Sequence, residues 1–108
     1  MDLLFISAEL QRACGRRRAM IEQWGPAHAD LVAQRLQELD SVQNLADLEL
    51  LPYLRLVPTR GGRVVMVHGS DGVRVRLRPE IQRQSTQASD GWRGSTAVVV
   101  LEVVLAKS

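Results

Sequence analysis

A chain of 108 residues with a formal net charge of +2 is long enough for one modest hydrophobic core, so we expect one domain over residues 1–108. Its one cysteine excludes an internal disulfide framework and favours a reducing compartment. No apolar stretch approaches the roughly 20 residues of a membrane span, and the start MDLLFIS lacks a basic leader segment. We therefore expect a cytoplasmic protein that does not enter a membrane.

Helical patterns fill the first half of the chain, from about residue 7 to 51, after a short apolar strand at residues 3–6. Ser7 is a suitable N-cap for the stretch AELQRAC, and Gly15 can end that helix. A second short helix is expected over residues 17–24, where the following Gly-Pro pair closes it. These two pieces precede the longest helix of the chain.

Pro26 suits the first turn of that longer helix, which we expect to reach about Ser41 because its apolar residues recur three to four apart. Asn44 can then cap a single turn that Pro52 ends. Together with the two shorter helices, this pattern predicts a helical hairpin with one buried face.

The spacing of the apolar residues changes at Tyr53 from a helical period to that of strands. The part from about residue 53 to 105 therefore predicts a sheet. Its strands are YLRLV, RVVMVH, VRVRLR and STAVVVLEVVL, and the last is a nearly continuous apolar run, typical of a strand buried on both faces. The turn sequences RGG and GSDG favour antiparallel hairpins between the earlier strands. Helices followed by a meander predict an α+β fold, with the helical hairpin packed on a mostly antiparallel sheet.

A long polar segment, PEIQRQSTQASDGWRGS at residues 79–95, connects the last two predicted strands. Loops of this length without secondary structure are usually functional or mobile. We interpret this one as mobile, with Trp92 as an anchor to the body of the domain.

Basic residues are concentrated in the second half of the chain. Residues 1–54 hold five arginines against eight acidic residues, whereas residues 55–95 hold eight arginines against three. In the strand VRVRLR, side-chain alternation places the apolar residues on one face and Arg74, Arg76 and Arg78 on the other. Like charges on one strand face repel each other, so this arrangement indicates a surface that binds an anion.

Pairing of the strands as hairpins would bring Arg55, Arg63 and Arg74 to one surface, with Arg60 on the adjacent turn. Such a cluster would neutralise a phosphate backbone and make binding dependent on salt. The alternative is structural, because the same arginines could protect sheet edges or pair with acidic residues of the helices.

Sequence motifs for other chemistries are missing. The chain has no Walker loop, dinucleotide fingerprint, nucleophile elbow or zinc spacing. His28 and His68 lie forty residues apart, and each is expected to be a capping or surface residue. We therefore expect neither a metal site nor a cofactor.

An ordered set of motifs extends over nearly the whole chain. It begins with the predicted helix pair and continues with NLADLELLP at residues 44–52, Arg55, TRGGR at 59–63, VRVRLRP at 73–79 and STAVVVLEVV at 95–104. The set resembles the RelE/ParE toxin superfamily, and most closely its HigB-type branch of plasmid-maintenance killer proteins. In that branch the corresponding motifs, in the same order, are LEDL..LP..R.H.LKGDRKG, YRLIFEP and TAI.ILEIVDYH.

This resemblance implies the toxin of a type II toxin–antitoxin system, which cuts messenger RNA in the ribosomal A site and so inhibits translation. It also implies a neutralising antitoxin, a small DNA-binding protein of the helix-turn-helix type. The reaction would be attack of a ribose 2′-hydroxyl on the neighbouring phosphate, which requires a base, cations and an acid. By position, Arg74 would stabilise the phosphate with Arg60 and Arg63, while Arg55, Arg76 and Arg78 would bind RNA.

The proton-transfer groups of the family are replaced in this chain. The histidine of the pattern R.H.L falls on Val57, and the terminal Asp-Tyr-His falls on residues 105–107. Arginine stays protonated and is a poor general base. The groups that could supply the missing step are Lys107, Tyr53, His68 and Glu102, and we take Lys107 as the catalytic candidate.

Two other functions remain open from the sequence. One is a non-catalytic relative of the same fold, either a degenerate toxin kept for antitoxin binding or a ParE-like inhibitor of a topoisomerase. The other is an RNA-binding accessory protein unrelated to toxins. The missing terminal Asp-Tyr-His favours the non-catalytic relative.

Overall fold

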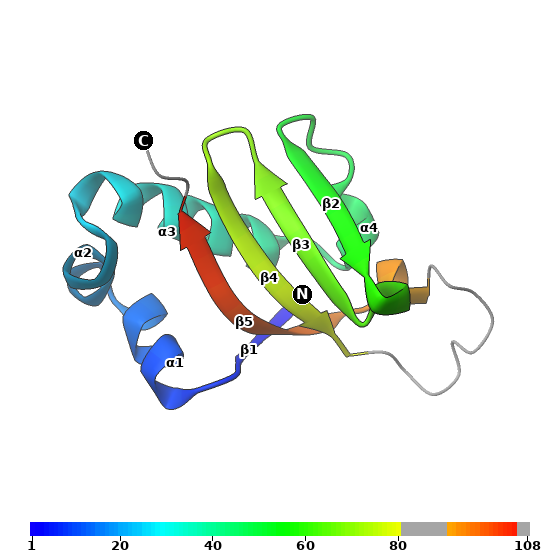
Figure 1. The fold of residues 1–108 in the computed structure, drawn as a ribbon, viewed down its shortest axis with the longest axis horizontal. Coiled ribbons are helices and arrows are strands. Elements are labelled where there is room, and N and C mark those ends of the chain that lie inside the picture. The colour runs from blue at the N-terminus through cyan, green and yellow to red at the C-terminus, as the bar shows by residue number, and fades with distance from the viewer. Residues whose placement is uncertain (81–90, 106–108) are drawn as a thin grey trace.

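The computed structural model describes residues 1–80 and 91–105 and has the α+β fold that the sequence predicts (Figure 1). The helices are α1 (Ala8–Gly15), α2 (Arg17–Trp24), α3 (Pro26–Ser41) and α4 (Leu45–Leu48), with short 3-10 turns η1 (Arg60–Gly62) and η2 (Gly91–Gly94). The strands are β1 (Asp2–Phe5), β2 (Leu54–Thr59), β3 (Val64–Gly69), β4 (Val73–Pro79) and β5 (Ala97–Leu105).

The strands form one five-stranded sheet in the order β1-β5-β4-β3-β2. The predicted hairpins β2–β3 and β3–β4 are confirmed, and β5 continues the antiparallel pairing on the other side of β4. β1 runs parallel to β5 and pairs with it only as far as Val100. β5 therefore has strands on both sides along its first half. Both of its faces are buried there, at Val98, Val99 and Val100, as its apolar sequence predicts, whereas the residues from Leu101 to Leu105 are only half-buried.

The hydrophobic core lies between α3 and one face of the sheet, and α2 packs along α3 (Figure 1). Most of the buried residues come from α3 and from alternate positions of the strands, and they include Val32, Leu36, Leu39, Val65, Val67, Val73, Val75, Leu77, Val98 and Val100. None of the described helices lies over β2, β3 and β4 on the opposite face, which we call the open face (Figure 1). In the described part of the chain, no helix is both long and apolar enough to cross a membrane.

The helix ends follow the capping residues of the sequence. The Ser7 side chain accepts a hydrogen bond from the Leu10 backbone nitrogen at 3.1 Å, and Asn44 accepts one from Asp47 at 3.1 Å. Pro26 is the first residue of α3, which ends at Ser41 as predicted. Local capping chemistry was therefore sufficient to predict these boundaries.

Trp92 anchors the end of the long connection, as predicted. Its side chain is 2% exposed, and η2 packs against α4. A Cβ atom on Gly62 would lie 2.2 Å from the Trp92 ring, and Gly62 has φ +89°, so only glycine fits this position. The predicted mobility of the loop concerns residues 81–90, which lie outside the described residues.

Candidate nucleic-acid interface

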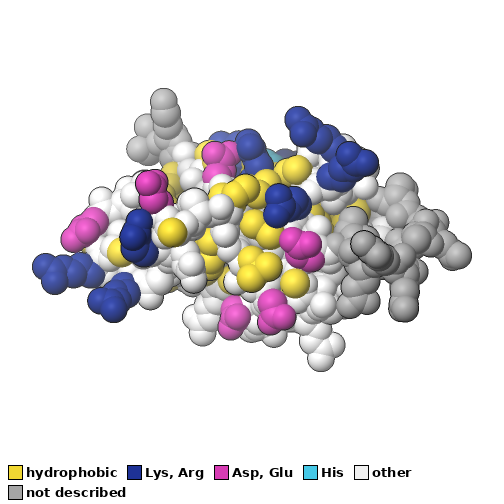
Figure 2. All heavy atoms as spheres, turned by 90° about the horizontal axis from the view of Figure 1, so that it is seen from below, with side chains coloured by type: hydrophobic (Ala, Val, Ile, Leu, Met, Phe, Trp, Pro, Cys, Tyr) yellow, Lys and Arg dark blue, Asp and Glu magenta, His cyan; other side chains and the backbone are white. Residues whose placement is uncertain are grey.

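The open face of the sheet carries the arginines of β4. Val73, Val75 and Leu77 are fully buried against the core, whereas Arg76 and Arg78 are exposed and Arg74 is half-buried. Figure 2 shows arginine side chains along the upper side of the molecule, where the open face lies, and a second group at the helical end. The predicted division of this strand into an apolar and a basic face is therefore confirmed.

Cross-strand pairing brings a histidine between two of the predicted arginines. Arg55 of β2 pairs with His68 of β3, and His68 pairs with Arg74 of β4. Directly opposed residues on antiparallel strands have Cβ atoms about 5 Å apart and point to the same face. We call these three residues the Arg–His–Arg row.

The electrostatics of this row favour a neutral histidine. Partial burial is the largest cause that lowers the pKa of His68 from its ordinary value of 6.5, and the charges of Arg55 and Arg74 lower it further. No described carboxylate forms an ion pair with Arg55 or Arg74. At neutral pH the row therefore combines an imidazole that can accept a proton with two guanidinium groups that can bind a phosphate.

The predicted residues Arg60 and Arg63 lie at the other end of the hairpin, beside the β2–β3 turn. His68 lies five residue steps beyond Arg63 along the chain, which corresponds to about 17 Å in a strand. The structure therefore does not bring Arg63 together with Arg55 and Arg74. Arg60 has φ 52° and lines a hollow that Arg76 also lines.

Carboxylates accompany the other two arginines of β4. Arg76 forms an ion pair with Glu102 of β5 at 2.8 Å, and Arg78 lies 3.9 Å from Glu80. Both pairs are about half exposed, and ion pairs with this exposure are weak and easily exchanged for another anion. Arg76 and Arg78 can therefore contact RNA only in competition with these carboxylates.

The structure separates the candidates for proton transfer. Tyr53 donates a hydrogen bond to Glu38, which is the largest cause that raises the pKa of this phenol. Glu102 is paired with Arg76, and Lys107 lies outside the described residues. His68 is thus the candidate that lies between two arginines without a described carboxylate partner. Within the described residues, no three His, Cys, Asp or Glu side chains are grouped as a metal site.

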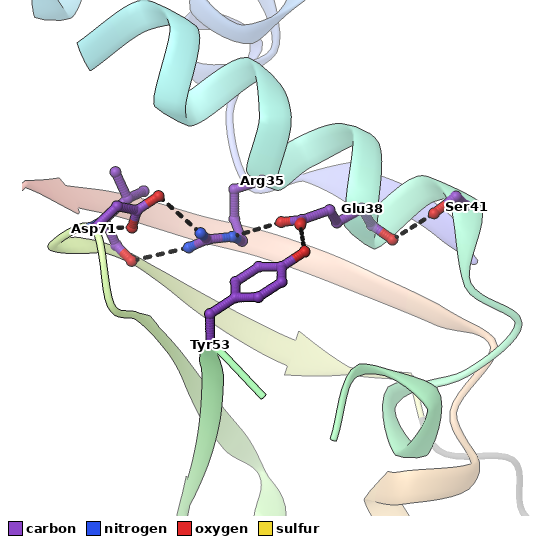
Figure 3. A network of polar contacts seen from close by, with 6 residues as sticks. Arg35, Glu38, Ser41, Tyr53 and Asp71 are labelled. Atoms are coloured by element: carbon purple, nitrogen blue, oxygen red, sulfur yellow. Dashed lines mark hydrogen bonds and ion pairs between the residues drawn. The ribbon is translucent and has the colours of Figure 1, made fainter. Parts of the chain in front are cut away.

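A buried arginine on the core side of the sheet fixes the β3–β4 turn, which lies between His68 and Arg74 (Figure 3). Arg35 of α3 is 1% exposed and donates hydrogen bonds to Glu38 at 2.9 Å and to Asp71 at 2.9 Å. It also donates to the Val73 carbonyl oxygen at 3.2 Å, and Asp71 accepts a bond from the Val73 backbone nitrogen. The β3–β4 turn is therefore held from below, between His68 and Arg74.

Sequence reasoning did not single out Arg35, although a signal was present. Its position falls within the apolar stripe of α3, between Val32 and Leu39. A cation on the core face of a helix requires polar partners, and Asp71 in the GSDG turn is one of them.

Comparisons with protein-family models, with curated proteins and with solved structures gave no match for this chain. The resemblance to RelE/ParE toxins therefore depends on the order of the sequence motifs.

Proposed function

We propose that this protein is a HigB-like, ribosome-dependent endoribonuclease, the toxin of a type II toxin–antitoxin pair, and that the Arg–His–Arg row is its active site. The single observation that carries the proposal is the pairing of His68 with Arg55 on one side and Arg74 on the other. This combination supplies a base and cations next to each other on an open face, as RNA cleavage requires.

In the proposed reaction, His68 takes the proton of a ribose 2′-hydroxyl as its oxygen attacks the adjacent phosphorus. Arg55 and Arg74 stabilise the negative charge that develops on the non-bridging oxygens. The bond from phosphorus to the 5′ oxygen then breaks, which leaves a 2′,3′-cyclic phosphate and a 5′-hydroxyl that takes its proton from water. His68 replaces Lys107 as the candidate base, because its neighbours favour the neutral form.

The substrate would be messenger RNA in the ribosomal A site, and the protein would act in the cytoplasm. Arg76, Arg78, Arg60 and Arg63 would bind phosphates on either side of the cut. A small helix-turn-helix antitoxin would neutralise the toxin. The alternatives are a non-catalytic relative that binds an antitoxin and an inhibitor of a topoisomerase. The test below distinguishes them from an endoribonuclease.

The test is to induce the chain alone in a bacterial host and to map new messenger 5′ ends within minutes. We expect ends inside reading frames at a fixed codon phase, and we expect Arg74→Ala and His68→Gln to remove both the ends and the growth arrest. Arg18→Ala is the matched control, because Arg18 is an exposed arginine of α2 far from the row in sequence and on another element.

Three results would contradict the proposal. Cleavage that persists in His68→Gln would exclude this histidine as the base. Growth arrest without new 5′ ends would indicate a different target, such as a topoisomerase. Absence of both arrest and ends would indicate a non-catalytic protein.

A further inference from the structure

A second hollow lies beyond the arginines of β4, where the helices meet the sheet. Ser7, Leu10, Gln23, Trp24, Leu101 and Glu102 contribute to its lining. Its walls come from the start of α1, the end of α2 and the part of β5 beyond Val100, where the pairing with β1 has ended. In Figure 1, α1 and α2 lie beside this part of β5.

The lining combines the groups that proteins use to bind an unstacked base. Trp24 is a partly buried aromatic side chain, and stacking on such a ring is favourable for every base. The Gln23 amide can donate and accept hydrogen bonds, and the Glu102 carboxylate accepts them. Single-stranded RNA is recognised in this way, by stacking together with hydrogen bonds to the base edges.

The hollow is also close to the predicted phosphate contacts. Glu102 forms its ion pair with Arg76 on the neighbouring strand, so the two sites meet at this pair. Neighbouring strands lie about 4.8 Å apart, so the hollow begins roughly 5 to 10 Å from the arginines of β4. A nucleotide whose phosphate contacts Arg74 or Arg76 can therefore extend its base across β5 into the hollow.

We propose that this hollow is a nucleobase pocket that gives the protein a base preference, for a base with an exocyclic amino group over uracil. The inference rests on the proposed function for RNA as the ligand and extends that function to substrate selection. Glu102 accepts a hydrogen bond from the amino group, while the carbonyl oxygens of uracil meet a negative charge. When Glu102 turns to the base, Arg76 is released to bind a phosphate.

The test measures the affinity of the purified protein for fluorescent oligo(A), oligo(C) and oligo(U) RNA at one salt concentration. We expect oligo(A) and oligo(C) to bind about tenfold more tightly than oligo(U). Trp24→Ala should weaken oligo(A) binding about tenfold, since one stacked base contributes this order of affinity. Gln23→Ala should weaken it by about the same factor, because a hydrogen bond to the base edge is lost. Glu102→Gln should remove the preference while all RNAs bind at least as tightly, because Arg76 loses its carboxylate partner.

Gln11→Ala is the matched control for Gln23→Ala, because Gln11 is an exposed glutamine of α1 that does not line this hollow. Trp24→Phe keeps an aromatic ring, so it should retain most of the binding even if Trp24→Ala fails to fold. Equal binding of the three RNAs, or a preference unchanged in Gln23→Ala and Glu102→Gln, would overturn the inference.

These affinities, together with the mapping of messenger 5′ ends, separate this inference from the proposed function. Cleavage of messenger RNA by a protein without base preference would support the endoribonuclease and exclude the pocket. A base preference that depends on Gln23 and Glu102, in a protein that leaves RNA intact on ribosomes, would support the pocket and exclude the endoribonuclease. No binding of any RNA would contradict both.

Discussion

His68 is the residue whose chemistry depends most on its neighbours. Its partial burial and the charges of Arg55 and Arg74 all disfavour the imidazolium form, so its pKa lies below 6.5. The same two arginines that would bind a phosphate therefore keep the base ready to accept a proton. Loss of either arginine should therefore weaken phosphate binding and also raise the pKa of His68.

This coupling predicts a specific pH dependence of cleavage. The single-turnover rate should rise with pH and level off, with a midpoint below 6.5, because only neutral His68 accepts the proton. Arg55→Gln should move the midpoint upward by removing one positive neighbour, whereas Arg55→Lys should leave it near the wild-type value. A midpoint that is the same in wild type, Arg55→Gln and Arg55→Lys would contradict the role of these charges.

At the scale of elements, the Arg35 network connects α3 to the β3–β4 turn. Glu38 and Asp71 are mostly buried partners of a fully buried cation. Removal of one member of such a network leaves buried charge without compensation, which costs several kcal/mol. The turn between His68 and Arg74 thus depends on a side chain from the opposite layer.

Arg35→Met should therefore lower the free energy of unfolding by about 3 kcal/mol, as measured by urea denaturation. Arg17→Met is the matched control, because Arg17 pairs with Asp30 on the exposed helix surface. The control should leave the urea midpoint unchanged, since exposed ion pairs contribute little to stability. Equal effects of the two substitutions would show that the buried network does not stabilise the fold.

Local sequence signals were sufficient to predict most elements. Pro26, Ser41 and the caps Ser7 and Asn44 have the predicted positions, and the alternation in VRVRLR gave the correct buried face. The pairing of β1 with β5 was not predicted, because a parallel contact between the two ends of the chain leaves no local pattern.

The Arg–His–Arg row was only partly predicted. Arg55 and Arg74 were expected on one surface together with Arg63, which lies at the other end of the hairpin, and His68 was one of several candidates for proton transfer. Its position follows from register, since Arg55 and His68 are equally distant from the centre of the β2–β3 turn, and His68 and Arg74 are equally distant from Asp71. Counting outward from the two turns would have placed His68 in the row.

At the scale of the whole molecule, positive charge on the open face is separated from the core and from α3 by the sheet itself. Single-stranded RNA bound to this face should show an affinity that decreases with salt, because each neutralised phosphate releases counterions. In a plot of log Kd against log salt, Arg74→Ala should reduce the slope by about 0.7. Arg18→Ala, on α2, should leave the slope unchanged, and an equal reduction in both variants would contradict a specific RNA-binding face.

The proposed active site is tested most directly by the rate at which wild type and His68→Asn cleave messenger RNA on programmed ribosomes, with RNA affinity measured in parallel. Loss of the general base should reduce the rate by about 10² to 10⁴. RNA affinity should stay within about twofold of wild type, because the arginines that bind phosphate remain. A His68→Asn protein that cleaves at the wild-type rate, or a wild-type protein that does not cleave at all, would contradict the assignment of the Arg–His–Arg row as an active site.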